Sequence, residues 1–382
     1  MFERRLGGQQ GAGGQGDRGG PRRRTPARRG AAAVLLLALA VWVVVAPPAG
    51  ATTITVTTTT DENNSDGDCS LREAIRAANN DQAVDACPAG NGADAIVVPA
   101  GDYVFNPALS LTKEDLAAQG DLDIREDLTL TGAGRTQTTL DAAGIDRVLH
   151  VAAGVKLTLA NLTITGGDAH DDMGGGILVY TGAALDMTNV RVTGNTTGTA
   201  TGFLSGGGIL LFKVATSSIT FSRIDNNFAA NTGGGLYYEF ETASGDLTIR
   251  DSRIDDNEAG SGGGLYTGFG TTTISGSLIR GNLANSTSGG GGGITSNGAL
   301  IVLNSTLAGN SAVNSGGALS VGSGSAAELD NVTMTNNTAA VNKGNQGDGG
   351  GIRIASGTVT LRNALLYGND ALSSAGSTHP DC

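Results

Sequence analysis

Arginine and aspartate recur at fixed distances before a repeated asparagine, and they are the first residues of this chain that could do chemistry. The place four residues before the asparagine holds Arg191, Arg223 and Arg253, and the place two residues before it holds Asp225, Asp255 and Arg280. Residues two apart in a strand point to the same side, so these side chains should be neighbours within and between repeats. All except Arg191 are candidates for a catalytic site. A surface ion-pair ladder explains the same pattern and is the interpretation we favour.

An apolar and aromatic row offers a different chemistry, which is binding. It occupies outward positions of the strand that follows each glycine run, in four successive repeats: Leu178, Tyr180, Leu210, Phe212, Tyr237 and Tyr266. Aromatic side chains on a flat sheet suit sugar rings or a partner protein. The alternative, which we slightly favour, is that the longer loops near 196–205 and 239–245 fold over this row.

An acidic loop near the N-terminus has the spacing of a calcium site. Its candidate ligands are Glu62, Asn64, Asp66, Asp68 and Glu73. Carboxylates around a turn glycine suit a hard cation such as calcium. Glutamate stands where aspartate is usual and no helix precedes the loop, so a solvated turn is the favoured interpretation. No cofactor other than calcium is expected.

A third candidate is the loop of residues 168–172, where His170 lies among the carboxylates of Asp168, Asp171 and Asp172. One histidine among carboxylates could act in acid–base chemistry or hold a metal ion. A single loop without a second histidine is more often a polar loop, and that is the interpretation we prefer.

The elements that position these residues belong to a repeat. Seven times, a glycine run, two short apolar strands and an asparagine follow one another, the first run starting at Gly174. The closing asparagines run from Asn195 to Asn369, which is 174 residues in six intervals, or 29 per repeat. This period is typical of a solenoid. The positions three and eight residues before each closing asparagine are apolar in all seven repeats, which predicts parallel strands stacked around an apolar interior.

The N-terminal residues precede the fold. Residues 1–30 contain arginine clusters, 31–46 are continuously apolar, and 49–51 fit a cleavage site, so residues 1–51 are predicted to be a signal peptide with a basic head. An uncleaved membrane anchor is the alternative. The remaining chain has 16 basic and 34 acidic residues, a net charge of −18. Such an acidic surface lacks the basic patch that nucleic acid binding needs, so nucleic acid is excluded as a partner. Contact with a membrane is expected only through the export signal.

Residues 52–93 are predicted to cap the solenoid. Ser70 and Glu73 form a capping box before a short amphipathic helix that would cover the open edge of the first coil. Cys69 and Cys87 are 18 residues apart, and in an exported chain they are expected to form a disulfide. Cys382 has no evident partner, and the chain could be truncated after it.

Residues 69–74 read CSLREA, and Cys87–Gly90 and Asp94–Tyr103 follow. Residues 52–105 thereby resemble the CSLREA-type N-terminal domain of bacterial secreted and surface proteins. The resemblance implies a right-handed parallel β-helix of the pectin-lyase-like superfamily, and the repeats predict roughly ten coils over residues 94–382. The repeats are also similar to those of polymorphic outer-membrane proteins, although the position three before the asparagine is aliphatic instead of phenylalanine.

Two functions remain open. The leading hypothesis is a non-enzymatic, exported β-helix, adhesin-like, whose partner is a glycan or a protein surface. The alternative is a carbohydrate-active enzyme, either a glycoside hydrolase or a polysaccharide lyase. The resemblance implies that such a lyase would use an arginine as the base and aspartate-bound calcium beside it, which points to the Arg/Asp rows. A fold alone does not choose between these functions.

Overall fold

The computed structural model describes residues 50–110, 114–170, 172–199, 202–239, 245–339 and 348–372. The chain divides into two units, residues 1–42 and 43–382, and every described residue belongs to the second. Most of the predicted signal peptide, together with Asp171 and Cys382, lies outside the described residues. No helix among the described residues is long and apolar enough to span a membrane.

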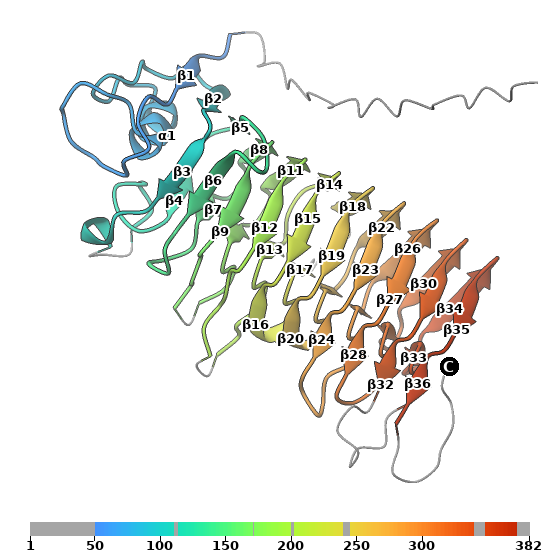
Figure 1. Ribbon diagram of the computed structural model, residues 1–382. Helices are drawn as coiled ribbons and strands as arrows, with labels where there is room; N and C mark the ends of the chain where they lie inside the picture. The colour runs from blue at the N-terminus through green and yellow to red at the C-terminus, as the bar shows by residue number, and fades with distance from the viewer. Residues whose placement is uncertain are drawn as a thin grey trace, which may run out of the picture. The chain divides into compact units, whose positions relative to one another are not determined.

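The described strands form four parallel sheets, of 11, 10, 6 and 9 strands, which we call sheets 1 to 4. Figure 1 shows successive coils stacked side by side. Sheet 1 contains β1 Thr53–Thr55, β2 Asp94–Val98, β5 Leu128–Gly132, β8 Lys156–Ala160, β11 Ala184–Thr188, β14 Ser217–Thr220, β18 Asp246–Arg250, β22 Thr271–Ser275, β26 Ala299–Leu303, β30 Ala326–Asp330 and β34 Thr358–Arg362. Sheet 2 contains β3 Gly101–Val104, β6 Thr138–Asp141, β9 Thr163–Thr165, β12 Arg191–Thr193, β15 Arg223–Asp225, β19 Arg253–Asp255, β23 Leu278–Arg280, β27 Thr306–Ala308, β31 Thr333–Thr335 and β35 Leu365–Tyr367.

Two further sheets complete the coils. Sheet 3 contains β16 Phe228–Thr232, β20 Glu258–Ser261, β24 Leu283–Ala284, β28 Ser311–Ala312, β32 Thr338–Ala339 and β36 Asp370–Ala371. Sheet 4 contains β4 Leu122–Ile124, β7 Leu149–Val151, β10 Ile177–Val179, β13 Ile209–Phe212, β17 Leu236–Glu239, β21 Leu265–Thr267, β25 Ile294–Ser296, β29 Leu319–Val321 and β33 Ile352–Ile354. This is the predicted parallel β-solenoid, and the expected number of roughly ten coils fits.

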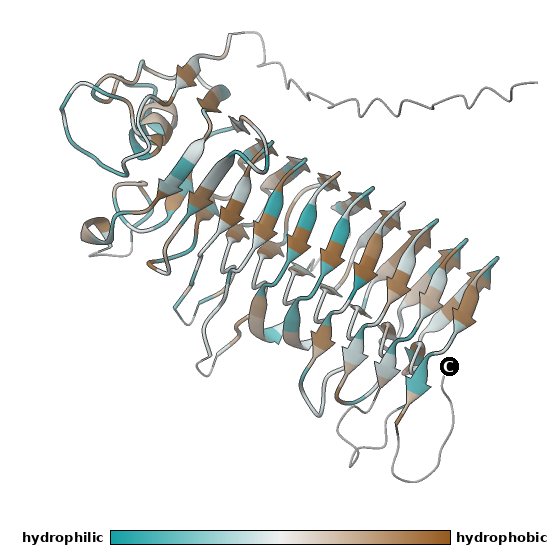
Figure 2. Ribbon diagram, in the orientation of Figure 1, coloured by the Kyte–Doolittle hydropathy of each residue, from teal (hydrophilic) through white to brown (hydrophobic). Residues whose placement is uncertain are grey.

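The predicted inward rows form the core. Ile177, Met187 and Val192 of one coil are fully buried and pair with Ile209, Ile219 and Ile224 of the next. In the last described coil Leu361 is 41% exposed, because no described coil covers it. In Figure 2 a hydrophobic residue lies between hydrophilic ones in strands such as β15 and β19.

The closing asparagines form a buried ladder from Asn195 to Asn369. The side-chain amide of each donates to the side-chain oxygen of the next, over 2.8–3.0 Å. The same oxygen also accepts the backbone N–H of the previous asparagine. The ladder therefore satisfies polar groups that the turn would otherwise leave buried and unpaired.

The glycine runs allow close approach of neighbouring coils. Gly233 has a φ of 65°, a left-handed conformation that favours glycine. A Cβ on Gly234 would collide with the carbonyl oxygens of Glu258 and Gly263 in the next coil. The repeated glycines are therefore required by packing.

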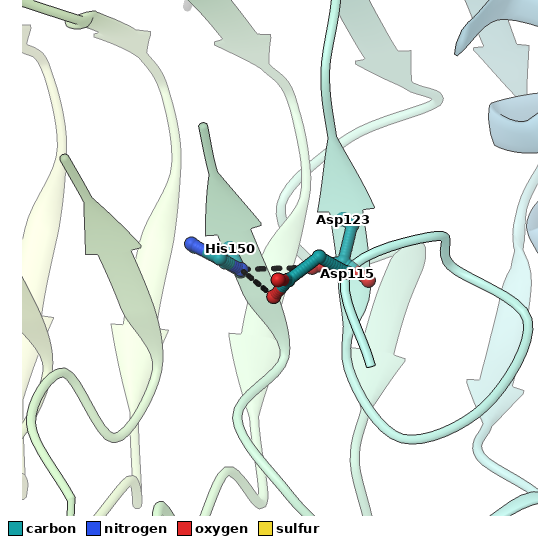
Figure 3. Close-up of side chains that lie close together, drawn as sticks. All are labelled: Asp115, Asp123 and His150. Carbon is teal, nitrogen blue, oxygen red and sulfur yellow. Dashed lines mark hydrogen bonds and ion pairs between the residues drawn. The ribbon is translucent and has the colours of Figure 1, made fainter. Parts of the chain in front are cut away.

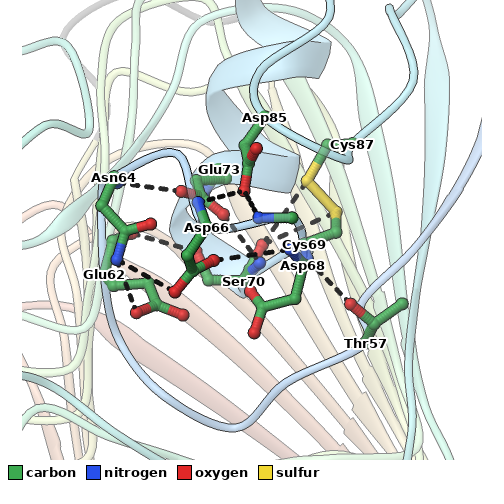
Figure 4. Close-up of a disulfide and its surroundings, with 11 residues drawn as sticks. Thr57, Glu62, Asn64, Asp66, Asp68, Cys69, Ser70, Glu73, Asp85 and Cys87 are labelled. Carbon is green, nitrogen blue, oxygen red and sulfur yellow. Dashed lines mark hydrogen bonds between the residues drawn. A yellow bond between two sulfur atoms is a disulfide. The ribbon is translucent and has the colours of Figure 1, made fainter.

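The N-terminal cap is a single helix tied to the first strands. Helix α1 spans Leu71–Asn80 with Ser70 as its N-cap, and the capping box with Glu73 is present. A short 3-10 helix, η1, follows at Pro107–Leu109. The Cys69–Cys87 disulfide is present, in agreement with the sequence, and Figure 4 shows it beside the acidic loop.

Candidate functional site

The structure places the Arg/Asp rows of sheet 2 in one ion-pair ladder. Two pairings reach from one coil to the next: Arg191 binds Asp225 through two hydrogen bonds of 2.9 and 2.6 Å, and Arg223 binds Asp255 through two of 2.9 and 2.8 Å. Arg253 donates to Asp255 at 3.0 Å, and Arg280 lies 3.8 Å from the same carboxylate. Both aspartates are fully buried beneath these guanidinium groups.

The electrostatics of the ladder oppose proton transfer. Burial alone would raise the pKa of Asp225, but the hydrogen bonds and charge of Arg191 outweigh it and lower that pKa. The hydrogen bond to Asp255 raises the pKa of Arg223, although burial opposes it. A guanidinium held in this way does not act as a base at neutral pH. These residues come together, but as the ion-pair ladder and not as an open cleft.

The outward row of sheet 4 is longer than the sequence suggested. Register places nine side chains in line, one per coil: Asp123, His150, Leu178, Leu210, Tyr237, Tyr266, Thr295, Ser320 and Arg353. The row changes in character along the stack. It is charged at its start, apolar in the middle and polar at its end.

The apolar middle of the row is covered. Leu178, Leu210 and Tyr237 are at most 2% exposed and form a second cluster outside the main core, against which Met173, Phe212 and Tyr266 pack. Phe203, in the loop before β13, meets the Tyr237 ring edge-on at 6.0 Å. Leu178, Leu210 and Tyr237 are therefore not available on the surface, as the alternative in which loops cover the row expected. Tyr180 is 36% exposed, and Phe212 and Tyr266 are half-buried.

The polar end of the row lines a groove of about 430 Å³. Its lining includes Ser261, Tyr266, Thr295, Asn297, Ser320 and Arg353. Tyr266 stacks on Tyr237 with centroids 5.1 Å apart, and its hydroxyl accepts a hydrogen bond of 2.6 Å from the Asn297 amide. Arg353 has no ion-pair partner among residues of the described ranges. This groove presents hydroxyl, amide, aromatic and cationic groups together, which we call the polar groove.

The charged start of the row lines a second pocket, of about 460 Å³, which we call the acidic pocket. Six carboxylates line it, from Glu114, Asp115, Asp121, Asp123, Asp146 and Asp172. Two guanidinium groups, of Arg125 and Arg147, also line it, together with His150 and Tyr180. Burial raises the pKa of Asp121 to about 7, although Arg147, whose Nε lies 2.8 Å from Asp121 Oδ2, opposes the shift.

Of the residues that line this pocket, only Tyr180 and Asp172 were candidates from the sequence. The signal was present, because Leu122-Asp123-Ile124 and Leu149-His150-Val151 share the apolar, variable, apolar pattern of Ile177-Leu178-Val179. Both segments precede the first glycine run, so the repeat did not mark their register.

The acidic loop of the cap brings only part of its predicted ligand set together. Oxygens of Glu62, Asp66 and Asp68 lie within 4.8 Å of one another. Glu73, by contrast, accepts hydrogen bonds from the backbone N–H groups of Ser70 and Asn64, so both its oxygens are engaged (Figure 4). The Asn64 amide donates to the Glu62 and Asp66 carboxylates. Partial burial and the charges of Asp66 and Asp68 raise the pKa of Glu62.

The described residues of the loop 168–172 do not gather in one site. The His170 side chain is 55% exposed, and its Nδ1 lies 3.7 Å from Asp168. Asp172 belongs instead to the acidic pocket, where its carboxylate lies 3.2 Å from Arg147. Asp171 lies outside the described residues.

The β-helix is also found by comparison with known protein families. Residues 137–307 match the family model described as the right-handed beta helix region. The fold is a right-handed parallel β-helix. No curated protein matches the chain in sequence.

Three solved structures resemble this β-helix at low identity. The pectate lyase Pel9A is 12% identical with a TM-score of 0.43, over 82% of this chain and 78% of that one. A Geobacillus virus E2 protein, ORF18, is 11% identical with a TM-score of 0.42 over 74% of this chain. This chain spans about half (54%) of the length of the viral protein. The endo-xylogalacturonan hydrolase from Aspergillus tubingensis is 16% identical with a TM-score of 0.33, over 87% and 98% of the two chains. Similarity at this level carries no information on activity.

Proposed function

We propose that this protein is an exported, non-enzymatic β-helix that binds glycans in the polar groove. The observation that carries the proposal is the meeting of Tyr266, Asn297 and Arg353 with several hydroxyl groups in one groove of about 430 Å³. Sugars present hydroxyl groups around apolar ring faces, so polar donors beside an aromatic side chain are suited to them.

Contacts within the protein preorganise the side chains of the polar groove. Stacking on Tyr237 and the hydrogen bond from Asn297 hold the Tyr266 ring. The hydroxyl groups of Ser261 and Thr295 lie 3.0 Å apart. Side chains held in this way lose little rotamer freedom on binding, which favours affinity.

Export is part of the proposal. Support comes from the Cys69–Cys87 disulfide, because disulfides persist in oxidising environments. The basic and apolar segments of residues 1–51 and the resemblance of residues 52–105 to the CSLREA-type domain also support it. Attachment to a cell surface would follow from an adhesin-like role.

The ion-pair ladder supports the non-enzymatic part of the proposal. A lyase needs a base that can lose its proton, whereas Arg223 and Arg253 are paired to buried carboxylates. Asp225 and Asp255 are fully buried, so they are not open to a calcium ion.

A glycan array probed with the full chain tests the proposal. Binding to at least one glycan is expected, and Arg353→Ala and Tyr266→Ala should each weaken it about tenfold or more, as removal of a central contact does. Tyr367→Ala is the matched control, because Tyr367 is 70% exposed on sheet 2, away from the groove.

Two outcomes would overturn the proposal. The first is binding that survives both groove substitutions. The second is a rise in absorbance near 235 nm when uronate polymers and calcium are added, because this signals the unsaturated product of a lyase. Arg353 is only partly buried, so its variant is expected to fold even if Tyr266→Ala does not.

A further inference from the structure

The acidic pocket contains a histidine that faces two carboxylates. His150 in β7 pairs in register with Asp123 in β4, so their side chains are neighbours in the outward row. His150 Nδ1 lies 2.8 Å from Asp123 Oδ1 and 3.7 Å from Asp115 Oδ1. Figure 3 shows the carboxylates on one side of the ring, while the ring's other nitrogen points away from them.

The three side chains have the spacing of metal ligands. One ligand atom from each lies within 4.8 Å of the other two. Metal bonds to imidazole nitrogen and carboxylate oxygen are about 2.0–2.2 Å long, so atoms around a tetrahedral ion are separated by roughly 3.3 Å. The observed separations of 2.8 and 3.7 Å lie on either side of that value. Only small side-chain movements would complete the site.

The surrounding contacts hold two of the ligands in place. Asp123 is 1% exposed, and its second oxygen accepts the backbone N–H of Ala117 at 2.8 Å, which directs the first oxygen to His150. The His150 ring meets the Tyr180 ring edge-on, with centroids 5.1 Å apart. Supporting contacts of this kind orient the ligands in metal sites.

The His150 ring is buried beside the two carboxylates. It is 8% exposed, and its Nδ1 is the ring nitrogen that lies near the Asp123 and Asp115 oxygens. Its Nε2 is buried with no hydrogen-bond partner among the described residues. An imidazole nitrogen that faces two carboxylate oxygens is an arrangement that a metal ion can bridge.

We propose that Asp115, Asp123 and His150 bind a divalent transition-metal ion of the Zn²⁺ type. The six carboxylates of the acidic pocket outnumber its two guanidinium groups, so the pocket attracts a cation. A buried imidazole nitrogen selects against Ca²⁺ and Mg²⁺, which take oxygen ligands, and suits Zn²⁺ and its neighbours. Asp115, whose side chain is 85% exposed, closes the site from the solvent side.

Titration of the full chain with ZnCl₂ in a calorimeter tests this proposal. One Zn²⁺ should bind at pH 7.5, and Asp115→Asn should weaken binding at least tenfold, in the range that metal-site substitutions show. His150→Ala should abolish it. The Asp115 side chain is exposed, so its variant should fold even if His150→Ala does not. Co²⁺ in place of Zn²⁺ should give a visible absorption band that both variants lose.

Two control variants isolate the site. His170→Ala removes an exposed histidine that also lies near an aspartate, and it should leave Zn²⁺ affinity unchanged. Glu62→Gln removes one carboxylate from the acidic loop of the cap, which is the other group among the described residues with the spacing of metal ligands. This variant should also leave Zn²⁺ affinity unchanged. Absence of Zn²⁺ binding by the unmodified chain would overturn the proposal. So would affinity that neither Asp115→Asn nor His150→Ala changes.

Discussion

Asp225 and Asp255 are carboxylates on the outer side of sheet 2, yet neither is exposed to solvent. Arg191 and Arg223 contact Asp225, and Arg223, Arg253 and Arg280 contact Asp255. Isolated surface pairs contribute about 0–1 kcal/mol, but a buried carboxylate that loses its partners can cost about 3–5 kcal/mol. The arginines and aspartates of the ladder therefore matter to stability mainly because a buried carboxylate that loses its partners is costly.

The ladder predicts a pH dependence of stability. Because its folded-state pKa lies below the ordinary value of 3.8, Asp225 binds a proton less tightly in the folded protein than in the unfolded one. Its contribution to the free energy of unfolding is complete above about pH 4 and is lost as pH falls through the lowered pKa. Thermal melts between pH 7 and pH 2 should show a steep loss of Tm in acid, and Asp225→Asn should flatten that loss.

The matched control for this prediction is Asp256→Asn. Asp256 is exposed and has a positive φ of 56°, which asparagine also tolerates. Its variant should keep the acid dependence of the parent. Identical melting curves for the Asp225 and Asp256 variants would show that the ladder contributes nothing to acid sensitivity.

Sheet 4 is the element in which the outward row changes from charged to apolar to polar. Its middle strands, β10, β13 and β17, direct Leu178, Leu210 and Tyr237 away from the main core, and Phe203 of a connecting loop packs on Tyr237. Together with Met173, Phe212 and Tyr266, which pack on the same cluster, these contacts give the strands apolar side chains on both faces. Such strands read as continuous apolar runs, as Ile209–Phe212 does.

This burial predicts that Leu210 behaves as a core residue. Leu210→Ala should lower the free energy of unfolding by about 3 kcal/mol, within the range for buried leucines. Phe269→Ala, which removes a larger but 60% exposed side chain, should change it by less than about 0.5 kcal/mol. Urea denaturation followed by circular dichroism measures both. Equal small effects would mean that the row is an open surface.

Most of the fold could be predicted from sequence, because its information is periodic. The inward rows, the asparagine ladder and the capping box each follow from residue spacing. The sequence left the burial of Leu210 and Tyr237 as one of two alternatives, because burial depends on how irregular segments outside the repeat pack. His150 and Asp123 were missed for a related reason: their coils lack the glycine run that marks register. The acidic pocket thus lies where the repeat is least regular.

The whole solenoid is stabilised mainly by contacts between adjacent coils, so its cap protects one end. Arg72 of α1 links that cap to the first coils. It is 1% exposed, and it donates to the Asp61 carboxylate and to the carbonyl oxygens of Ala117, Gly120 and Asp121. Three of these acceptors lie in the segment that leads into β4 and the acidic pocket.

Loss of Arg72 should therefore act locally. Arg72→Met takes the ion-pair partner from the Asp61 carboxylate and a donor from three carbonyl oxygens, a change that can cost about 3–5 kcal/mol. In hydrogen exchange measured by mass spectrometry, β1, β2 and β4 should lose protection, whereas β22, β26 and β30 should keep it, because each coil contacts only its neighbours. Arg76→Met, on the same helix but only partly buried, is the control and should leave protection unchanged. A uniform loss over all coils would instead mean that the cap and solenoid unfold as one cooperative unit.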